Sequence, residues 1–167
     1  MSQLLILLVF PALVVYAAVS DLLRMTIPNR VTVGLALAFF GVALVTGMAP
    51  AEIGWHLAAG ALVLVAAFAC FAFGWIGGGD AKMAAATALW FGFDHVLMYL
   101  LIGSALGGLL TLGLLQMRAL PLPRFAARHA WIARLHDTKT GVPYGIALAI
   151  AALIIYPETG WMQALGA

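Results

Sequence analysis

The chain consists of long hydrophobic runs separated by short polar breaks. The runs cover roughly residues 4–20, 31–46, 53–73, 81–91, 96–117 and 142–156. A helix needs about 20 apolar residues to cross a bilayer, within a range of roughly 17–25. The fourth run is shorter than that, so it either begins inside the preceding glycines or is re-entrant. The pattern predicts an all-α, polytopic membrane protein with about six transmembrane helices in one domain, residues 1–167.

Composition excludes an ordinary soluble protein. Hydrophobic residues make up 65% of the chain, charged residues make up only 8%, and the mean hydropathy is +1.11. The first run has no Lys or Arg before it and similar runs follow it, so we interpret it as a retained transmembrane helix rather than a cleaved signal peptide. The eight Lys and Arg are explained by membrane topology, as shown below. We therefore expect the lipid bilayer as a partner, and no nucleic acid.

Residue types that bind metals and cofactors do not cluster in the sequence. Cys70 is the single cysteine, which excludes an internal disulfide framework and a Cys-based zinc site. The four histidines are scattered, and none forms a pair at metal-ligand spacing. The glycine run at residues 77–79 lacks a following Gly-Lys-Ser/Thr and a preceding strand, which makes a phosphate-binding loop a weak reading. We expect neither a metal nor a cofactor.

Positive charges fall only in alternate breaks. If all six runs cross the membrane, the first, third and fifth breaks share one side, and the fifth is the long basic loop 118–141. These three breaks contain Arg24, Arg30, Lys82, Arg118, Arg124, Arg128, Arg134 and Lys139, whereas the other side contains Glu52, Asp94 and Glu158. Since cytoplasmic loops collect Lys and Arg, we predict that these breaks are cytoplasmic and that the N-terminus is outside. The basic loop is expected to attract anionic lipid headgroups.

Two aspartates lie at the predicted cytoplasmic ends of helices. Asp21 ends the first run and Asp80 begins the fourth, so topology places both carboxylates at one membrane depth on one face. An ionisable side chain at the edge of a hydrophobic helix is costly and is therefore a candidate for function. Two close carboxylates in a low-dielectric site share a proton, so one can activate water while the other protonates a carbonyl oxygen. The alternative is that each aspartate only ends or caps its helix, and the pair also requires the first and fourth helices to pack together.

The segment around Asp80 is rich in glycine. Gly77, Gly78 and Gly79 permit an extended or positive-φ backbone and the close approach of another chain. We expect an extended substrate to lie beside them, although glycines are equally typical of a plain loop. Lys82 follows closely, and it either contacts substrate and neutralises charge near the site or marks the cytoplasmic boundary.

Three patches of sequence, taken in order, resemble the type IV prepilin peptidases, which are membrane aspartyl proteases of the Gly-x-Gly-Asp kind. The patches are Ser20-Asp21-Leu22-Leu23-Arg24 with Ile27-Pro28-Asn29, then Gly77-Gly78-Gly79-Asp80-Ala81-Lys82, then Val142-Pro143-Tyr144-Gly145-Ile146-Ala147. The resemblance in spacing and hydropathy extends along nearly the whole chain. It implies catalytic roles for Asp21 and Asp80 on the cytoplasmic side, and a substrate-facing role for the glycine run. For the third patch it implies a helix start and a packing role.

The resemblance also implies a substrate and a location. The protein would be a multi-pass enzyme of the bacterial inner membrane whose active site faces the cytoplasm. Its substrates would be prepilins or pseudopilins, with a short basic leader, a glycine at the cut and a hydrophobic helix after it. Larger bifunctional members carry an extra cytoplasmic segment with paired Cys-x-x-Cys motifs and also N-methylate the new terminus. This chain has neither feature and is similar to the short, peptidase-only branch of Flp/Tad-type pilus biogenesis, so we do not predict methyl transfer.

Two other classes of function stay open on the sequence. A small proton-coupled transporter or channel subunit would use Asp21 and Asp80 as a relay. It predicts polar residues deeper in the helices, and the second, third and sixth runs contain almost none. A non-catalytic assembly protein would predict that Asp21→Asn and Asp80→Asn are both harmless.

Overall fold

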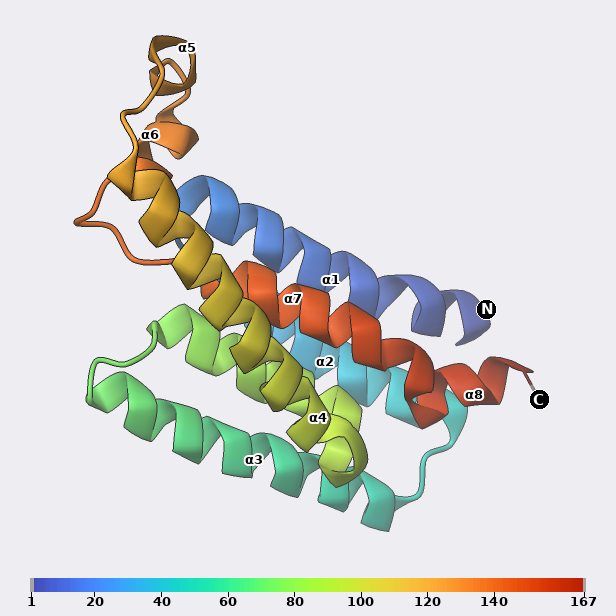
Figure 1. Ribbon diagram of the computed structural model, residues 1–167. Helices are drawn as coiled ribbons and strands as arrows, with labels where there is room; N and C mark the ends of the chain where they lie inside the picture. The colour runs from blue at the N-terminus through green and yellow to red at the C-terminus, as the bar shows by residue number, and fades with distance from the viewer. Residues whose placement is uncertain (1, 167) are drawn as a thin grey trace.

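The computed structural model describes residues 2–166, and every regular element in that range is helical. The elements are α1 (Ser2–Arg24), α2 (Asn29–Thr46), α3 (Pro50–Ala72), α4 (Gly78–Ala119), α5 (Arg124–Ala127), α6 (Ala130–His136), α7 (Tyr144–Ile155), the 3-10 turn η1 (Tyr156–Glu158) and α8 (Gly160–Gly166). The long helices pack side by side as a bundle in which α4 contacts α2, α3 and α7 (Figure 1). The predicted all-α class is confirmed.

Four helices are long and apolar enough to cross a membrane. They comprise the part Ile6–Arg24 of α1 and the whole of α2, α3 and α4, while the apolar stretch Tyr144–Glu158 is shorter. Many large apolar side chains on their outer faces are exposed, among them Leu37 at 66% and Val65 at 69%. Such exposure would be a liability in water and is expected for surfaces that face lipid. The predicted fourth and fifth runs both lie in α4, and the fourth begins inside the glycine run, which was one of its two expected forms.

The direction of α4 reverses at Gly92. A straight helix of its 42 residues would be about 63 Å long, roughly twice the hydrocarbon thickness of a bilayer. Gly92 has φ 58° and ψ −167°, a backbone conformation that is essentially restricted to glycine. Figure 1 shows the two arms, residues 78–91 and 93–119, folding back from this point. The break expected at residues 92–95 is therefore a one-residue turn, because glycine reverses the chain without a loop.

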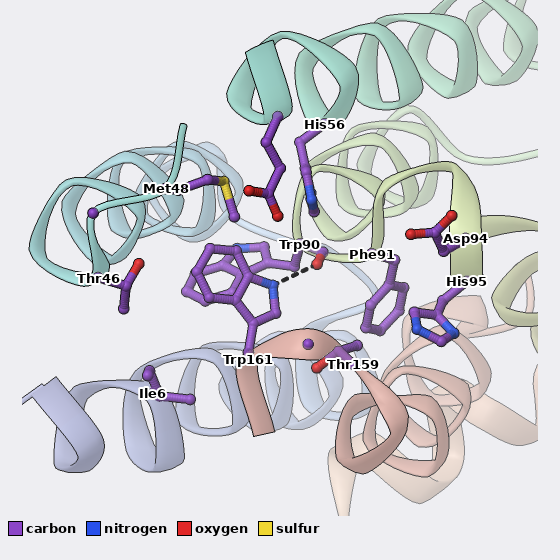
Figure 2. Close-up of a pocket in the computed structure, with 13 residues that line it drawn as sticks. Ile6, Thr46, Met48, His56, Trp90, Phe91, Asp94, His95, Thr159 and Trp161 are labelled. Carbon is purple, nitrogen blue, oxygen red and sulfur yellow. Dashed lines mark hydrogen bonds between the residues drawn. The ribbon is translucent and has the colours of Figure 1, made fainter. Parts of the chain in front are cut away.

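Side chains from two other helices cap the end of the first arm of α4. The last carbonyl groups of a helix lack intrahelical partners. His56 of α3 lies with Nδ1 2.5 Å from the carbonyl oxygen of Leu89, and the indole N–H of Trp161 donates to the carbonyl oxygen of Trp90 at 2.7 Å (Figure 2). A Cβ atom on Gly92 would meet the His56 ring at 3.1 Å. Both α3 and α8 thus hold the reversal in place.

Substituting Gly92 should destabilise the fold. Gly92→Ala forces a side chain into a glycine-only conformation and against His56, and we expect it to lower the free energy of unfolding by about 2–3 kcal/mol. Thermal unfolding in detergent, followed by circular dichroism, measures this change. The matched control is Gly113→Ala in the second arm, where a Cβ would have nothing within 4 Å. Equal melting temperatures for the two variants would contradict the structural role of Gly92.

A cluster of aromatic side chains, in a part of the bundle distant from the aspartates, packs the helices together. Phe10 stacks on Tyr156 with ring centroids 4.4 Å apart, and the indole N–H of Trp90 donates to the carbonyl oxygen of Leu35 at 3.0 Å. These contacts join α1, η1, α4 and α2 in one core. They determine how α1 and the first arm of α4 lie relative to each other, and hence where the helix ends that carry Asp21 and Asp80 meet.

The region predicted as the basic loop 118–141 contains helix and is tied to the bundle. Its first two residues extend α4, and α5 and α6 lie within it. The Arg118 guanidinium donates to the carbonyl oxygens of Leu135 at 2.7 Å and Gly141 at 2.8 Å. Arg134 donates to the carbonyl oxygen of Leu23, near the end of α1, at 2.6 Å. Both arginines therefore satisfy backbone carbonyl groups, a role that attraction to lipid headgroups alone does not predict.

Candidate active site

Asp21 and Asp80 line the same cavity. Asp21 lies in the last turn of α1 and Asp80 in the first turn of α4, and these helix ends, with the start of α7, lie at one end of the bundle (Figure 1). The cavity has a volume of about 290 Å³ and is lined by Asp21, Met25, Thr26, Ile27, Gly77, Gly78, Gly79 and Asp80. The structure thus supplies the lateral proximity that topology alone left open.

Asp21 is buried and is held by the start of α7. Its side chain is 5% exposed, and its Oδ2 accepts a hydrogen bond of 2.8 Å from the backbone N–H of Gly145. The first N–H groups of a helix have no intrahelical partners and carry the positive end of the helix dipole. A Cβ on Gly145 would lie 2.8 Å from Oδ2 and 2.9 Å from Cδ1 of Ile27. Only glycine lets α7 come this close, so Gly145 positions the Asp21 carboxylate.

The turn after Asp21 brings the three sequence patches together at Ile27. Met25 has a positive φ of 55°, which is uncommon for a residue other than glycine, and its N–H donates to the carbonyl oxygen of Asp21 at 2.7 Å. The Ser20 hydroxyl donates to the carbonyl oxygen of Thr26 at 2.9 Å. Ile27 is then buried where Cβ atoms on Gly79 and Gly145 would meet it, at 3.3 Å and 2.9 Å respectively. The first patch therefore packs directly on the other two.

The glycine run lets the backbone pass beside Asp80. Gly77 is the N-cap of α4. Its backbone is extended, with φ −72° and ψ 146°, which is one of the two conformations expected for the glycine run. A Cβ on Gly77 would lie 2.8 Å from Oδ2 of Asp80, and a Cβ on Gly78 would lie 3.2 Å from the Phe71 ring. Gly77 is exposed, and Gly78 and Gly79 are half-buried. The run is thus exposed at its first residue, Gly77, next to the carboxylate.

Lys82 lies outside the aspartate cavity. Its ammonium group donates to Oδ1 of Asn29 at 3.0 Å, which joins the start of α4 to the start of α2. The side chain lines a different hollow, between α2 and α3. Four residues were predicted to contact substrate. The structure places Gly77, Gly78 and Gly79 in the same cavity as the aspartates, and it places Lys82 in the separate hollow between α2 and α3.

Residues of the third patch anchor α7, and this role was only partly foreseen. The Tyr144 ring packs over Gly107, and its hydroxyl lies 3.0 Å from Oγ1 of Thr111 in the second arm of α4. The sequence predicts a helix start and a packing role at this patch. The sequence did not predict that Gly145 contacts Asp21. The resemblance of the third patch to the family was the feature that could have indicated this contact.

A second polar cavity lies at the opposite end of the bundle, and Figure 2 shows the side chains that line it. It has a volume of about 320 Å³, and its lining includes Glu52, His56, Asp94 and His95. Within the described part of the chain, no three His, Cys, Asp or Glu side chains converge to hold a metal ion. Two of its polar side chains, His56 and Trp161, cap the end of the first arm of α4 and so have a structural use. The aspartate cavity is therefore the candidate active site.

Comparison with models of protein families gave a match. A family model described as the type IV leader peptidase family matches residues 8–112. This range includes Asp21, the glycine run and Asp80, and it ends before the start of α7. No curated protein and no solved structure matches the chain.

Proposed function

Since the chain belongs to the type IV leader peptidase family, we propose that it is an aspartyl endopeptidase that removes the short basic leader of Flp/Tad-type prepilins. The observation that carries this proposal is the cavity shared by Asp21 and Asp80. Family membership supports a membrane peptidase that acts on prepilins. The paired carboxylates support the aspartic type of mechanism, which needs no covalent intermediate.

The proposed reaction uses both carboxyl groups. One carboxylate takes a proton from water, and the water oxygen bonds to the carbonyl carbon of the scissile peptide. The other, protonated carboxyl group gives its proton to the carbonyl oxygen, forming a neutral tetrahedral diol. The carboxyl group that took a proton from water then gives it to the amide nitrogen as the C–N bond breaks, and a hydroxyl of the diol returns its proton to the other carboxylate. This releases the leader with a new carboxyl group and the pilin with a new amino group. Asp21 and Asp80 can exchange roles as base and acid in this scheme.

The glycine run is the proposed place for the substrate backbone. Gly77 is exposed and lines the cavity beside Asp80, and the first N–H groups of α4 after it lack intrahelical partners, so an extended peptide can accept hydrogen bonds there. The basic leader would remain in the cytoplasm, and the hydrophobic helix of the prepilin would stay in the bilayer.

We propose that the chain crosses a bacterial inner membrane six times with its N-terminus outside. In this topology the two arms of α4 cross separately, and α7 with η1 forms the last crossing. The reversal at Gly92 and the confinement of all eight Lys and Arg to one side support this arrangement. It puts the aspartates at the cytoplasmic face, where the leader of an unprocessed prepilin lies.

A cleavage assay tests the proposed function. The purified protein in detergent is mixed with an intact Flp/Tad-type prepilin, and the products are identified by mass spectrometry. We expect one cut directly after the leader glycine and an unmethylated new N-terminus even when a methyl donor is supplied. A methylated product would contradict the peptidase-only assignment, and an uncut prepilin would contradict the function itself.

A carboxyl pair that shares one proton should give a bell-shaped dependence of cleavage on pH. At low pH both groups are protonated and no base is present, whereas at high pH both are ionised and no acid is present. The measurement is kcat/KM across the acidic and neutral range, with folding checked at each pH. A rate that stays constant through the acidic carboxyl range would contradict proton sharing.

A further inference from the structure

Met25 has an unusual backbone conformation for a methionine. Its φ of 55° lies in the left-handed region, and among the described residues it is the one residue other than glycine with a positive φ. Glycine adopts this conformation without steric cost, whereas a residue with a Cβ atom does not. Residues held in such conformations cluster at active sites and ligand clamps. A methionine here therefore indicates that the side chain has a use that glycine would not supply.

The Met25 side chain does not serve the hydrophobic core. It is half-buried, and within residues 2–166 it belongs to neither cluster of packed core side chains. Other groups hold the turn in which it lies. The N–H of Met25 donates to the carbonyl oxygen of Asp21 at 2.7 Å, and the Ser20 hydroxyl donates to the carbonyl oxygen of Thr26 at 2.9 Å. Packing therefore does not explain why this position carries a long apolar side chain.

Met25 is the apolar side chain that the aspartate cavity offers to a substrate. Two apolar side chains line this cavity, those of Met25 and Ile27. Ile27 is only 8% exposed, and it lies where Cβ atoms on Gly79 and Gly145 would meet it, so its surface is already covered. The rest of the lining consists of the two aspartates, Thr26 and the glycine run. A peptide held at the carboxylates would therefore find its apolar contact at Met25.

We propose that Met25 contacts the apolar side chain that directly follows the scissile bond. This inference rests on the proposed function and adds a residue that determines its specificity. The proposed substrate has glycine and basic residues on its leader side and a hydrophobic helix on its pilin side, so an apolar surface beside the carboxylates matches the pilin side. Methionine is unbranched and polarizable, and it packs against apolar side chains of different shapes. The site then accepts pilins that differ at this position, provided that the residue there is apolar.

A pair of substrates tests this contact. Two prepilins carry either leucine or alanine directly after the cut, and we expect the wild type to prefer leucine by about tenfold in kcat/KM, a size typical of small differences in apolar side chains. Met25→Gly should abolish the preference. Glycine is compatible with the φ of 55°, so this variant should stay folded. Met25→Leu keeps an apolar side chain and should keep the preference.

Disulfide cross-linking in membranes detects the contact without cleavage. Cys70→Ala removes the single native cysteine, and Asp80→Asn prevents cleavage of the bound prepilin. In this background, Met25→Cys should cross-link to a cysteine directly after the cut about tenfold more than to a cysteine at the leader glycine, because successive side chains of an extended peptide point to opposite sides. Met48→Cys, in the cavity at the opposite end of the bundle, is the matched control and should cross-link to neither.

Several results would overturn the Met25 contact. They include a wild type that cuts the leucine and alanine substrates equally, an unchanged leucine preference in Met25→Gly, and cross-links from Met25→Cys that favour the leader position or match those from Met48→Cys. A further one is that Met25→Gly, unlike the wild type, cuts a prepilin with alanine in place of the leader glycine, since Met25 would then limit side-chain size on the leader side. Failure of the wild type to cut any prepilin would instead overturn the proposed function, and the Met25 contact with it.

Discussion

Replacing either Asp21 or Asp80 by asparagine should lower kcat/KM for prepilin cleavage by about a thousandfold or more, because each carboxyl group is expected to carry a proton transfer in the reaction. Asparagine has nearly the shape of aspartate but is neither a general base nor a general acid. In Asp21→Asn the side-chain oxygen can still accept the hydrogen bond from the N–H of Gly145, so the site should keep its geometry. The assay is time-resolved cleavage of an intact prepilin by the purified variants in detergent.

A carboxylate elsewhere on the same helix provides the control. Asp94 is exposed at the opposite end of the bundle, in the second arm of α4. Asp94→Asn removes the same charge and should cleave at the wild-type rate. Thermal unfolding of all three variants should stay close to the wild type, which separates a chemical defect from a folding defect. A matching loss of activity in Asp94→Asn would show that charge in general, rather than the aspartate cavity, sustains cleavage.

Gly145→Ala should lower cleavage by about a hundredfold, although it removes no reactive group. The new Cβ would lie 2.8 Å from Oδ2 of Asp21, 3.1 Å from Cβ of Asp21 and 2.9 Å from Cδ1 of Ile27. These atoms must move apart, and a displacement of a reacting group by about 1 Å is enough for a loss of this size. We expect the fall mainly in kcat, because the groups that are displaced belong to the reaction.

Gly141→Ala is the matched control for Gly145→Ala. Gly141 precedes α7 by a few residues, and a Cβ there would have nothing within 4 Å. It should retain wild-type kcat and KM. If Gly145→Ala were as active as Gly141→Ala, the contact between α7 and Asp21 would be irrelevant to catalysis.

Hydropathy predicted the helical class and the approximate position of each long helix, but not where each helix ends. The first run stops at Ser20, whereas α1 continues to Arg24, because a helix can extend past the membrane edge on polar residues. The fourth and fifth runs appear separate because Asp94 and His95 interrupt the apolar pattern. The backbone continues as α4 through a reversal that depends on one glycine, and hydropathy does not report the φ and ψ angles of a single residue.

The candidate site was predictable in part. The distribution of Lys and Arg placed Asp21 and Asp80 on one face, and the glycines beside Asp80 pointed to a close backbone contact. The distance across the membrane plane depends on how α1, α4 and α7 pack, and that packing is a property of the whole aromatic core. The bond from Gly145 to Asp21 joins residues 124 positions apart, so no local pattern around Asp21 reveals it.

The central claim is that Asp21 and Asp80 act as one catalytic pair, and prepilin cleavage by a set of four proteins tests it most directly. The set is the wild type, Asp21→Asn, Asp80→Asn and the double variant, each shown to be folded by thermal unfolding. Because groups that act as a unit are strongly non-additive, we predict that each single variant is as inactive as the double variant. Cleavage near the wild-type rate by either single variant would contradict the pair.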